Sequence, residues 1–179
     1  MSSPLEKPWS LAELVRFEGP LSGVIPIAVC RRLIELQGGS DEGEIVVAGE
    51  LSTRAVEATP GEPAFVGTAS TFVRLTCERC LKKFDFALEA SFAVVFIAAI
   101  GERQDGPDFD FWELGCGTVR PADVVEEYLV LALPLAVKHA DDECAATAAE
   151  SPIAETDGRP TQSPFAGLRA ELDKQRHSD

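Results

Sequence analysis

Two cysteines three positions apart are the clearest chemical signal in the sequence. Cys77 and Cys80 lie in the stretch Leu75-Thr76-Cys77-Glu78-Arg79-Cys80, between two runs with strand-like alternation. Two thiolates presented by a tight turn supply half of a tetrahedral zinc site. The same spacing also fits a redox pair, or two reduced thiols packed in a turn. A thioredoxin-like pair needs a helix after the turn, whereas the residues after Cys80 alternate with period two, which disfavours the redox interpretation.

A zinc site at this turn needs two further ligands from distant positions. The candidates are His139, Cys144 and Cys116, since the sequence has no second C-x-x-C pair. The set Cys77, Cys80, His139 and Cys144 would complete a four-ligand site if the segment after Pro134 folds back onto the turn. Zinc binding and simple packing of reduced thiols therefore stay open as alternatives.

Basic residues gather around the same turn in a chain whose net charge is −14. Arg74, Arg79, Lys82 and Lys83 predict a small patch able to bind phosphate. The alternative is that they are solvated strand positions that balance Glu78 and Asp85. The overall charge repels nucleic acid and attracts basic partners, ribosomal proteins among them.

Catalytic signals are sparse. The sequence has two histidines, His139 and His177, and contains no Walker loop, Rossmann fingerprint, Gly-x-Ser-x-Gly or His-Glu-x-x-His motif. Its acidic clusters fall in expected loops, where carboxylates are usually solvated. The sequence therefore predicts a protein that is not an enzyme.

The residues around the turn predict an antiparallel sheet. Three β-type runs are joined by short connections and should form a meander around residues 45–97. In the third run, Lys83 to Ile97, seven apolar residues alternate with polar or small ones, which predicts one buried and one solvated face. Helices are expected after a capping box at Ser10 and Glu13, from Pro26 to Gln37, and from Pro121 to Pro134. The predicted fold class is α+β, with helices packed on the sheet.

The composition changes after residue 144. We expect an α+β domain over residues 9–144, a flexible linker rich in alanine and acids over residues 145–162, and a docking segment over residues 163–176. Phe165, Leu168 and Leu172 form a narrow apolar stripe in that last segment, which would bind either its own domain or a partner.

An intracellular location is expected from the cysteines and the apolar runs. Five cysteines, an odd number at irregular spacing, favour the reducing cytoplasm, and the N-terminus has no apolar signal-peptide region. The longest apolar runs are far shorter than a membrane span.

The order of these motifs resembles the YceD family of large ribosomal RNA subunit accumulation proteins. The resemblance rests on Leu75–Cys80, on Asp123–Pro134 with its E-x-x-L-x-L-A-L-P pattern, on His139 and Cys144, and on Ser163–Leu168. It implies a ribosome-biogenesis factor that promotes synthesis, processing or stability of 23S-type ribosomal RNA. Members of the family are not known as enzymes, and many relatives carry more cysteines after the second motif, where this chain keeps only Cys144.

Two mechanisms are compatible with that role. The protein is either an acidic adaptor that holds a basic ribosomal protein, or it contacts RNA directly through Arg74, Arg79, Lys82 and Lys83. The net charge favours the adaptor, because a small patch has to act against the field of the whole chain. An RNA-processing enzyme is a third and less favoured hypothesis. The oligomeric state is not determined by the sequence.

Overall fold

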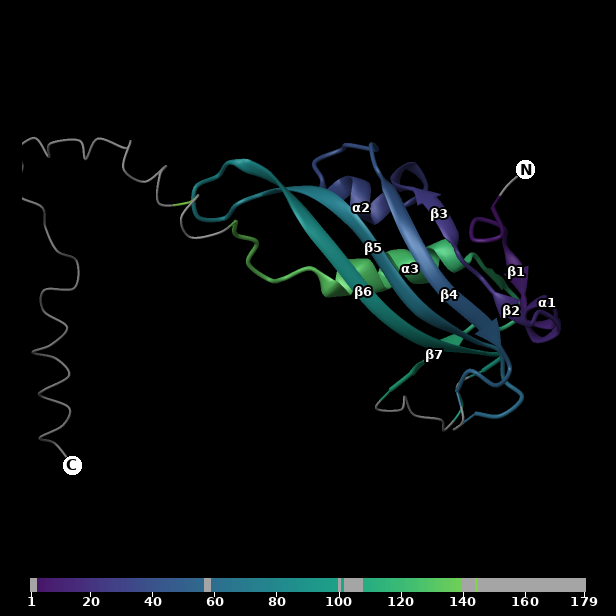
Figure 1. Cartoon of the computed structure of the whole chain (residues 1–179). Helices are drawn as coiled ribbons and strands as arrows, with labels where there is room; N and C mark the ends of the chain where they lie inside the picture. The colour runs from purple at the N-terminus through teal and green to yellow at the C-terminus, as the bar shows by residue number, and fades with distance from the viewer. Residues whose placement is uncertain (1–2, 57–58, 100, 102–107, 140–143, 145–179) are drawn as a thin grey trace, which may run out of the picture.

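The longest elements of the fold are two strands that meet at the cysteine turn. The computed structural model describes residues 3–56, 59–99, 101, 108–139 and 144 (Figure 1). Among these residues, none of the helices is long and apolar enough to span a bilayer. In chain order the elements are β1 (Trp9–Ser10), α1 (Leu11–Arg16), β2 (Gly19–Pro20), β3 (Gly23–Pro26), the 3-10 helix η1 (Ile27–Val29), α2 (Arg31–Leu36), β4 (Glu44–Ser52), β5 (Ala64–Thr76), β6 (Lys83–Ile97), β7 (Asp110–Glu113), β8 (Thr118–Val119) and α3 (Pro121–Ala132).

The predicted antiparallel meander is confirmed. β4 pairs with β5, and β5 pairs with β6 along a continuous register from Ala64↔Val95 to Thr76↔Lys83. The main sheet has the order β2-β4-β5-β6-β7, and β3 also pairs with β4. With α3 packed on this sheet, the protein has the α+β architecture that the sequence predicted.

One strand of the main sheet departs from the antiparallel pairing of the meander. The strand β7 pairs with β6 in parallel, with Phe96 opposite Trp112. A parallel neighbour requires a crossover of about a dozen residues, which the connection between the two strands supplies. The sheet is therefore mixed at the β7 edge.

The two faces of the sheet differ as the period-two pattern predicts. On β6, Leu88, Phe92 and Phe96 are buried, whereas Ala87 and Glu89 between them are exposed. In Figure 1 the strands β4, β5 and β6 cross in front of α3. This helix supplies Val124, Val125 and Leu129 to the shared core. We call the face packed on α3 the inner face and the opposite one the outer face.

A pair of glycines lets two strands approach closely on the inner face. Gly49 lies opposite Gly67 in the β4–β5 register. A Cβ atom on Gly67 would lie 2.5 Å from the Ala48 carbonyl oxygen and 2.6 Å from the Gly49 Cα. The ring of Phe65 covers Gly49 and lies 4.6 Å, centroid to centroid, from the ring of Phe92. The space that the absent side chains leave is thus filled by the two aromatic rings.

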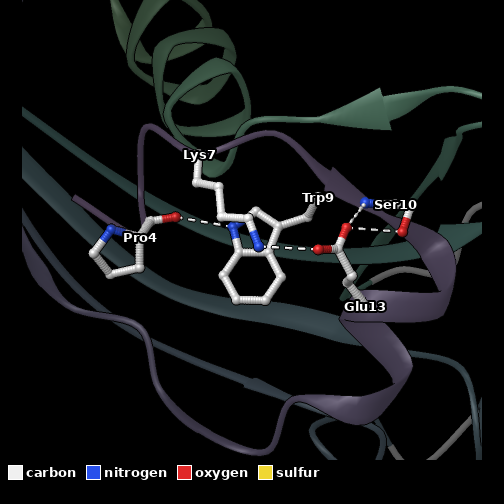
Figure 2. Close-up of polar contacts among 5 residues, drawn as sticks. All are labelled: Pro4, Lys7, Trp9, Ser10 and Glu13. Atoms are coloured by element: carbon white, nitrogen blue, oxygen red, sulfur yellow. Dashed lines mark hydrogen bonds and ion pairs between the residues drawn. The ribbon is translucent and has the colours of Figure 1, made fainter. Parts of the chain in front are cut away.

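The N-terminal segment is ordered locally by the predicted capping box at the start of α1 (Figure 2). The Glu13 carboxylate accepts hydrogen bonds from the Ser10 amide and the Ser10 hydroxyl, at 2.9 and 2.8 Å. These bonds and the contact with Lys7 lower the pKa of Glu13 to about 2. The Trp9 indole donates to the Pro4 carbonyl, with the Lys7 ammonium 4.7 Å from its ring. These contacts fix the turn that leads into α1 and satisfy the Ser10 amide at its N-cap.

The helix expected from Pro26 to Gln37 is divided in two. The backbone leaves the helical region at Cys30, with φ −104° and ψ 86°, between η1 and α2. Ile27, Cys30 and Leu33 of this stretch are buried. Cys30 makes no side-chain hydrogen bond that caps α2. Instead, the Glu126 carboxylate of α3 accepts from the Arg32 amide at 2.6 Å and from the Leu33 amide at 3.3 Å.

The contacts of Glu18 make stability depend on pH. Its carboxylate accepts bonds from the Ser52 hydroxyl and from the hydroxyl and amide of Thr53, which lowers the pKa of Glu18 from 4.5 to about 2. A carboxyl whose pKa is lowered by folding stabilises the fold above its unfolded pKa, and this contribution is lost as the pH falls toward the folded value.

We therefore expect Glu18→Gln to be less stable than the wild type at neutral pH, and the difference to shrink between pH 4.5 and 2. Urea unfolding across this range measures it. Glu42→Gln, at an exposed loop position, controls for the loss of one charge. A difference that does not change with pH would contradict the prediction.

Candidate metal centre at the hairpin tip

The turn between β5 and β6 presents both cysteines of the C-x-x-C pair. The Cys77 amide donates to the Lys82 carbonyl at 2.9 Å, and the Leu81 amide donates to the Cys77 carbonyl at 2.9 Å. Leu81 adopts a φ of 61°, in the left-handed region that non-glycine residues rarely occupy. Its side chain is 76% exposed. The pair thus lies in a strand–turn–strand setting, as the alternation after Cys80 predicted.

The segment after α3 returns to this turn. The chain runs from the end of α3 back to the β5–β6 tip (Figure 1), where the Glu78 amide donates to the Val137 carbonyl at 2.9 Å. The ring of His139 lies 5.2 Å from the ring of Phe84 at the start of β6. The folding back that a four-ligand site requires is therefore present.

Four ligand atoms converge at the tip. One donor atom each from Cys77, Cys80, His139 and Cys144 lies within 4.8 Å of the other three. The Cys77 and Cys144 sulfurs are 3.8 Å apart, and the Cys80 sulfur is 3.2 Å from the His139 Nε2. Two thiolates bound to one tetrahedral zinc are separated by about 3.8 Å, because each Zn–S bond is about 2.3 Å long. The geometry and the donor set of three sulfurs and one imidazole fit zinc.

Backbone amides stabilise the thiolate of Cys77. Burial by itself raises the pKa of this thiol, but the amides of Cys80, His139 and Arg79 and the Cys80 thiol lower it to about 6. Burial and the neighbouring sulfurs of Cys77 and Cys80 raise the pKa of Cys144 to about 11. Three neighbouring thiolates would repel one another. A bound cation would offset this repulsion and so favour the charged form of all three sulfurs.

The remaining cysteines lie elsewhere. Cys116 is exposed and is not in the cluster, so it is not one of the candidate ligands that the fold brings together. Cys30 is buried, and burial raises its pKa to about 12. Among the residues that the structure describes, neither cysteine belongs to a group of metal-ligating side chains.

The four predicted basic residues surround the same tip. Arg74 lies on β5 and pairs with Asp85 across the hairpin at 3.6 Å, both side chains being exposed. Arg79 and Lys82 belong to the turn, and Lys83 is the first residue of β6. The fold adds Lys138, an exposed side chain next to His139. In the sequence, the only indication that Lys138 would lie at the tip is its position next to the candidate ligand His139.

Some predicted parts lie outside the described residues. These are the linker at 145–162 and the docking segment at 163–176, with Phe165, Leu168 and Leu172.

The structure adds backbone contacts at the tip that were not predicted from the sequence. The amides that donate to Cys77 are typical of a tight C-x-x-C turn and were foreseeable, whereas the pairing of Glu78 with Val137 has no sequence signal.

Comparison with known proteins gives one match. A family model described as "Large ribosomal RNA subunit accumulation protein YceD" matches residues 65–170, more than half of the chain. The matched part includes most of β5, all of β6 and α3, and the four residues of the cysteine–histidine cluster. No curated protein and no solved structure matches the chain.

Proposed function

The chain belongs to the YceD family of large ribosomal RNA subunit accumulation proteins, and from this membership we propose that it acts as an acidic, non-catalytic adaptor for a basic large-subunit ribosomal protein. Bound to this partner in the cytoplasm, the adaptor promotes synthesis, processing or stability of the large-subunit ribosomal RNA. The match over residues 65–170 carries the assignment to ribosomal RNA accumulation.

The charge of the chain supports the adaptor mechanism. A net charge of −14 speeds association with a cationic partner and disfavours contact with RNA phosphates. An acidic protein attracts a ribosomal protein whose Lys and Arg side chains are exposed, because their charges are opposite. The family description names an accumulation protein and no reaction, which agrees with a function without catalysis.

Direct contact with RNA is the second candidate. Arg79, Lys82, Lys83 and Lys138 place four cations around one hairpin tip, and the exposed Leu81 lies among them. Phosphate contacts of this kind bind without sequence preference and weaken steeply with salt. Glu78 and Asp85 reduce the local charge, so this patch is the weaker of the two candidates.

Zinc has a structural role in the proposal. Bound by Cys77, Cys80, His139 and Cys144, the ion would join the β5–β6 tip to the segment that follows α3. It would close the domain at residues 9–144 and fix the point from which the linker at 145–162 leaves. The segment at 163–176, with Phe165, Leu168 and Leu172, then docks on the partner or on the domain.

The two mechanisms are separated by one binding experiment. The full chain is titrated with individually purified basic large-subunit proteins and with large-subunit RNA fragments at two salt concentrations. We expect one basic protein to bind and the RNA fragments not to bind. Lys82→Glu/Lys83→Glu should leave protein binding unchanged. RNA binding that falls steeply with salt and is lost in this variant, without protein binding, would overturn the adaptor mechanism.

A further inference from the structure

Three exposed apolar side chains occupy neighbouring positions on the outer face of the sheet. Val24 lies opposite Val46, and Phe72 follows two residues after Ser70, the β5 partner of Val46. These side chains are 46%, 54% and 71% exposed, and Phe72 is the only exposed phenylalanine in the described part of the chain. Apolar side chains gathered on one exposed face are typical of a surface that binds another molecule.

Carboxylates surround this apolar centre. Glu44 and Glu50 lie on β4 at either side of Val46, and Glu89 lies opposite Ser70 on β6. The registers place Val24, Val46, Ser70 and Glu89 in one row across four strands. The three glutamates are exposed and make no ion pair within the described residues. We call Val24, Val46, Phe72, Glu44, Glu50 and Glu89 the outer patch.

A hollow lies over β5 and β6 at the Ser70–Glu89 pair of the same row. Its volume is about 440 Å³, and its lining includes Thr68, Ser70, Glu89 and Ser91 on β5 and β6. Short hydroxyl side chains form the walls, and one carboxylate is available to an incoming cation. A long, flexible Lys or Arg side chain suits this arrangement, since its methylenes pack in the hollow while its charge meets Glu89.

The outer patch is separate from the metal centre. Toward the end of the sheet remote from the tip, Val95 and Ile97 are covered together with Ala64 by residues such as Phe111, so the exposed part of the face ends there. Toward the tip it ends at the Arg74–Asp85 pair. The patch therefore lies between these two ends, on the outer face, opposite the one on which α3 packs.

We propose that the outer patch binds a lysine- and arginine-rich segment of a basic protein, with Phe72 in contact with an apolar side chain of that segment and Glu44, Glu50 and Glu89 in contact with its cations. This inference rests on the proposed adaptor function and identifies the surface that performs it. Carboxylates around the patch repel RNA phosphates, and a second copy of a chain with net charge −14 is repelled in the same way.

The test uses a fluorescein-labelled peptide of alternating lysine and leucine, with fluorescence anisotropy as the readout. Glu44→Gln/Glu89→Gln is compared with Glu35→Gln/Glu78→Gln, which removes the same charge outside the patch. Phe72→Ala is compared with Leu131→Ala, since the two wild-type side chains are 71% and 68% exposed. We expect each patch variant to weaken binding about tenfold and each control less than about twofold.

Each alternative occupant has its own outcome, and each overturns the proposal. Equal losses of peptide affinity in the patch and control variants would show that the peptide responds only to the net charge of the chain. A wild-type dimer that dissociates on Phe72→Ala would assign the face to a second copy. A tenfold gain in peptide affinity when Phe165, Leu168 and Leu172 are replaced by alanine in the full chain would assign it to the chain's own segment.

The inference and the proposed function fail in different ways. If a purified large-subunit protein binds the wild type and both patch variants equally, the outer patch is wrong and the adaptor function stands. If the peptide binds at the patch and no basic large-subunit protein binds the chain, the adaptor function is wrong. If neither ligand binds the wild type, both are overturned.

Discussion

The full chain, purified without a chelator, is expected to carry about one equivalent of zinc, and Cys77→Ser to carry less than about a fifth of that. The reason is geometric. Three sulfurs and one imidazole nitrogen lie within 4.8 Å of one another, and the Cys77 sulfur also accepts amide hydrogen bonds that a serine oxygen would meet at the wrong distance. Elemental analysis of the purified protein measures the content directly.

Loss of zinc is expected to lower the free energy of unfolding by about 4 kcal/mol, which corresponds to free zinc about a thousandfold above its dissociation constant. Urea unfolding with and without chelator measures the loss. Cys116→Ser is the matched control, because this cysteine is exposed and outside the cluster, and it should keep the metal and the stability. A wild type with well under one equivalent of zinc would sink the metal hypothesis.

Glu126→Ala is expected to reduce the free energy of unfolding by about 3 kcal/mol, because hydrogen bonds to charged groups and buried donors left unsatisfied each contribute at this level. Glu126 is 9% exposed and accepts the Arg32 and Leu33 amides at the first turn of α2. No side chain of α2 replaces it, since Cys30 does not cap the helix. Thermal and urea unfolding measure the effect.

The neighbouring glutamate provides the control. Glu127 pairs with the Arg32 side chain near the surface, and such pairs contribute about 1 kcal/mol or less. Glu127→Ala should therefore have a much smaller effect than Glu126→Ala. Glu126→Gln keeps an acceptor oxygen and should recover part of the loss. Equal effects of the two alanine substitutions would show that the capping contact contributes nothing.

Local sequence patterns predicted the structure correctly where the spacing of apolar side chains follows directly from which face is buried. Seven apolar residues at period two on β6 predicted a strand with one buried face, and the burial of Leu88, Phe92 and Phe96 confirms it. Proline at the start and just past the end predicted α3, observed at Pro121–Ala132. The capping box at Ser10 and Glu13 was equally local, and it is present.

The sequence patterns did not predict the contacts between distant segments. The parallel sense of β7, the division of the Pro26–Gln37 helix at Cys30, and the burial of Glu126 each depend on which element lies against which. Glu126 of α3 is the hydrogen-bond acceptor for α2, because the two helices pack together and α2 has no cap of its own.

The metal centre and the outer patch also depend on packing that the sequence patterns do not determine. The sequence alone identified Cys77-x-x-Cys80 as a turn between strands and named His139 and Cys144 as the partners it needed. Only the tertiary structure brought the four side chains together, through the return of the chain after α3 and the contact of Val137 with Glu78. The outer patch arises from strand register, since Val24, Val46, Ser70 and Glu89 become neighbours only when four strands pair. Periodicity acts within a strand or a helix, whereas a site composed of separate segments depends on the packing that joins them.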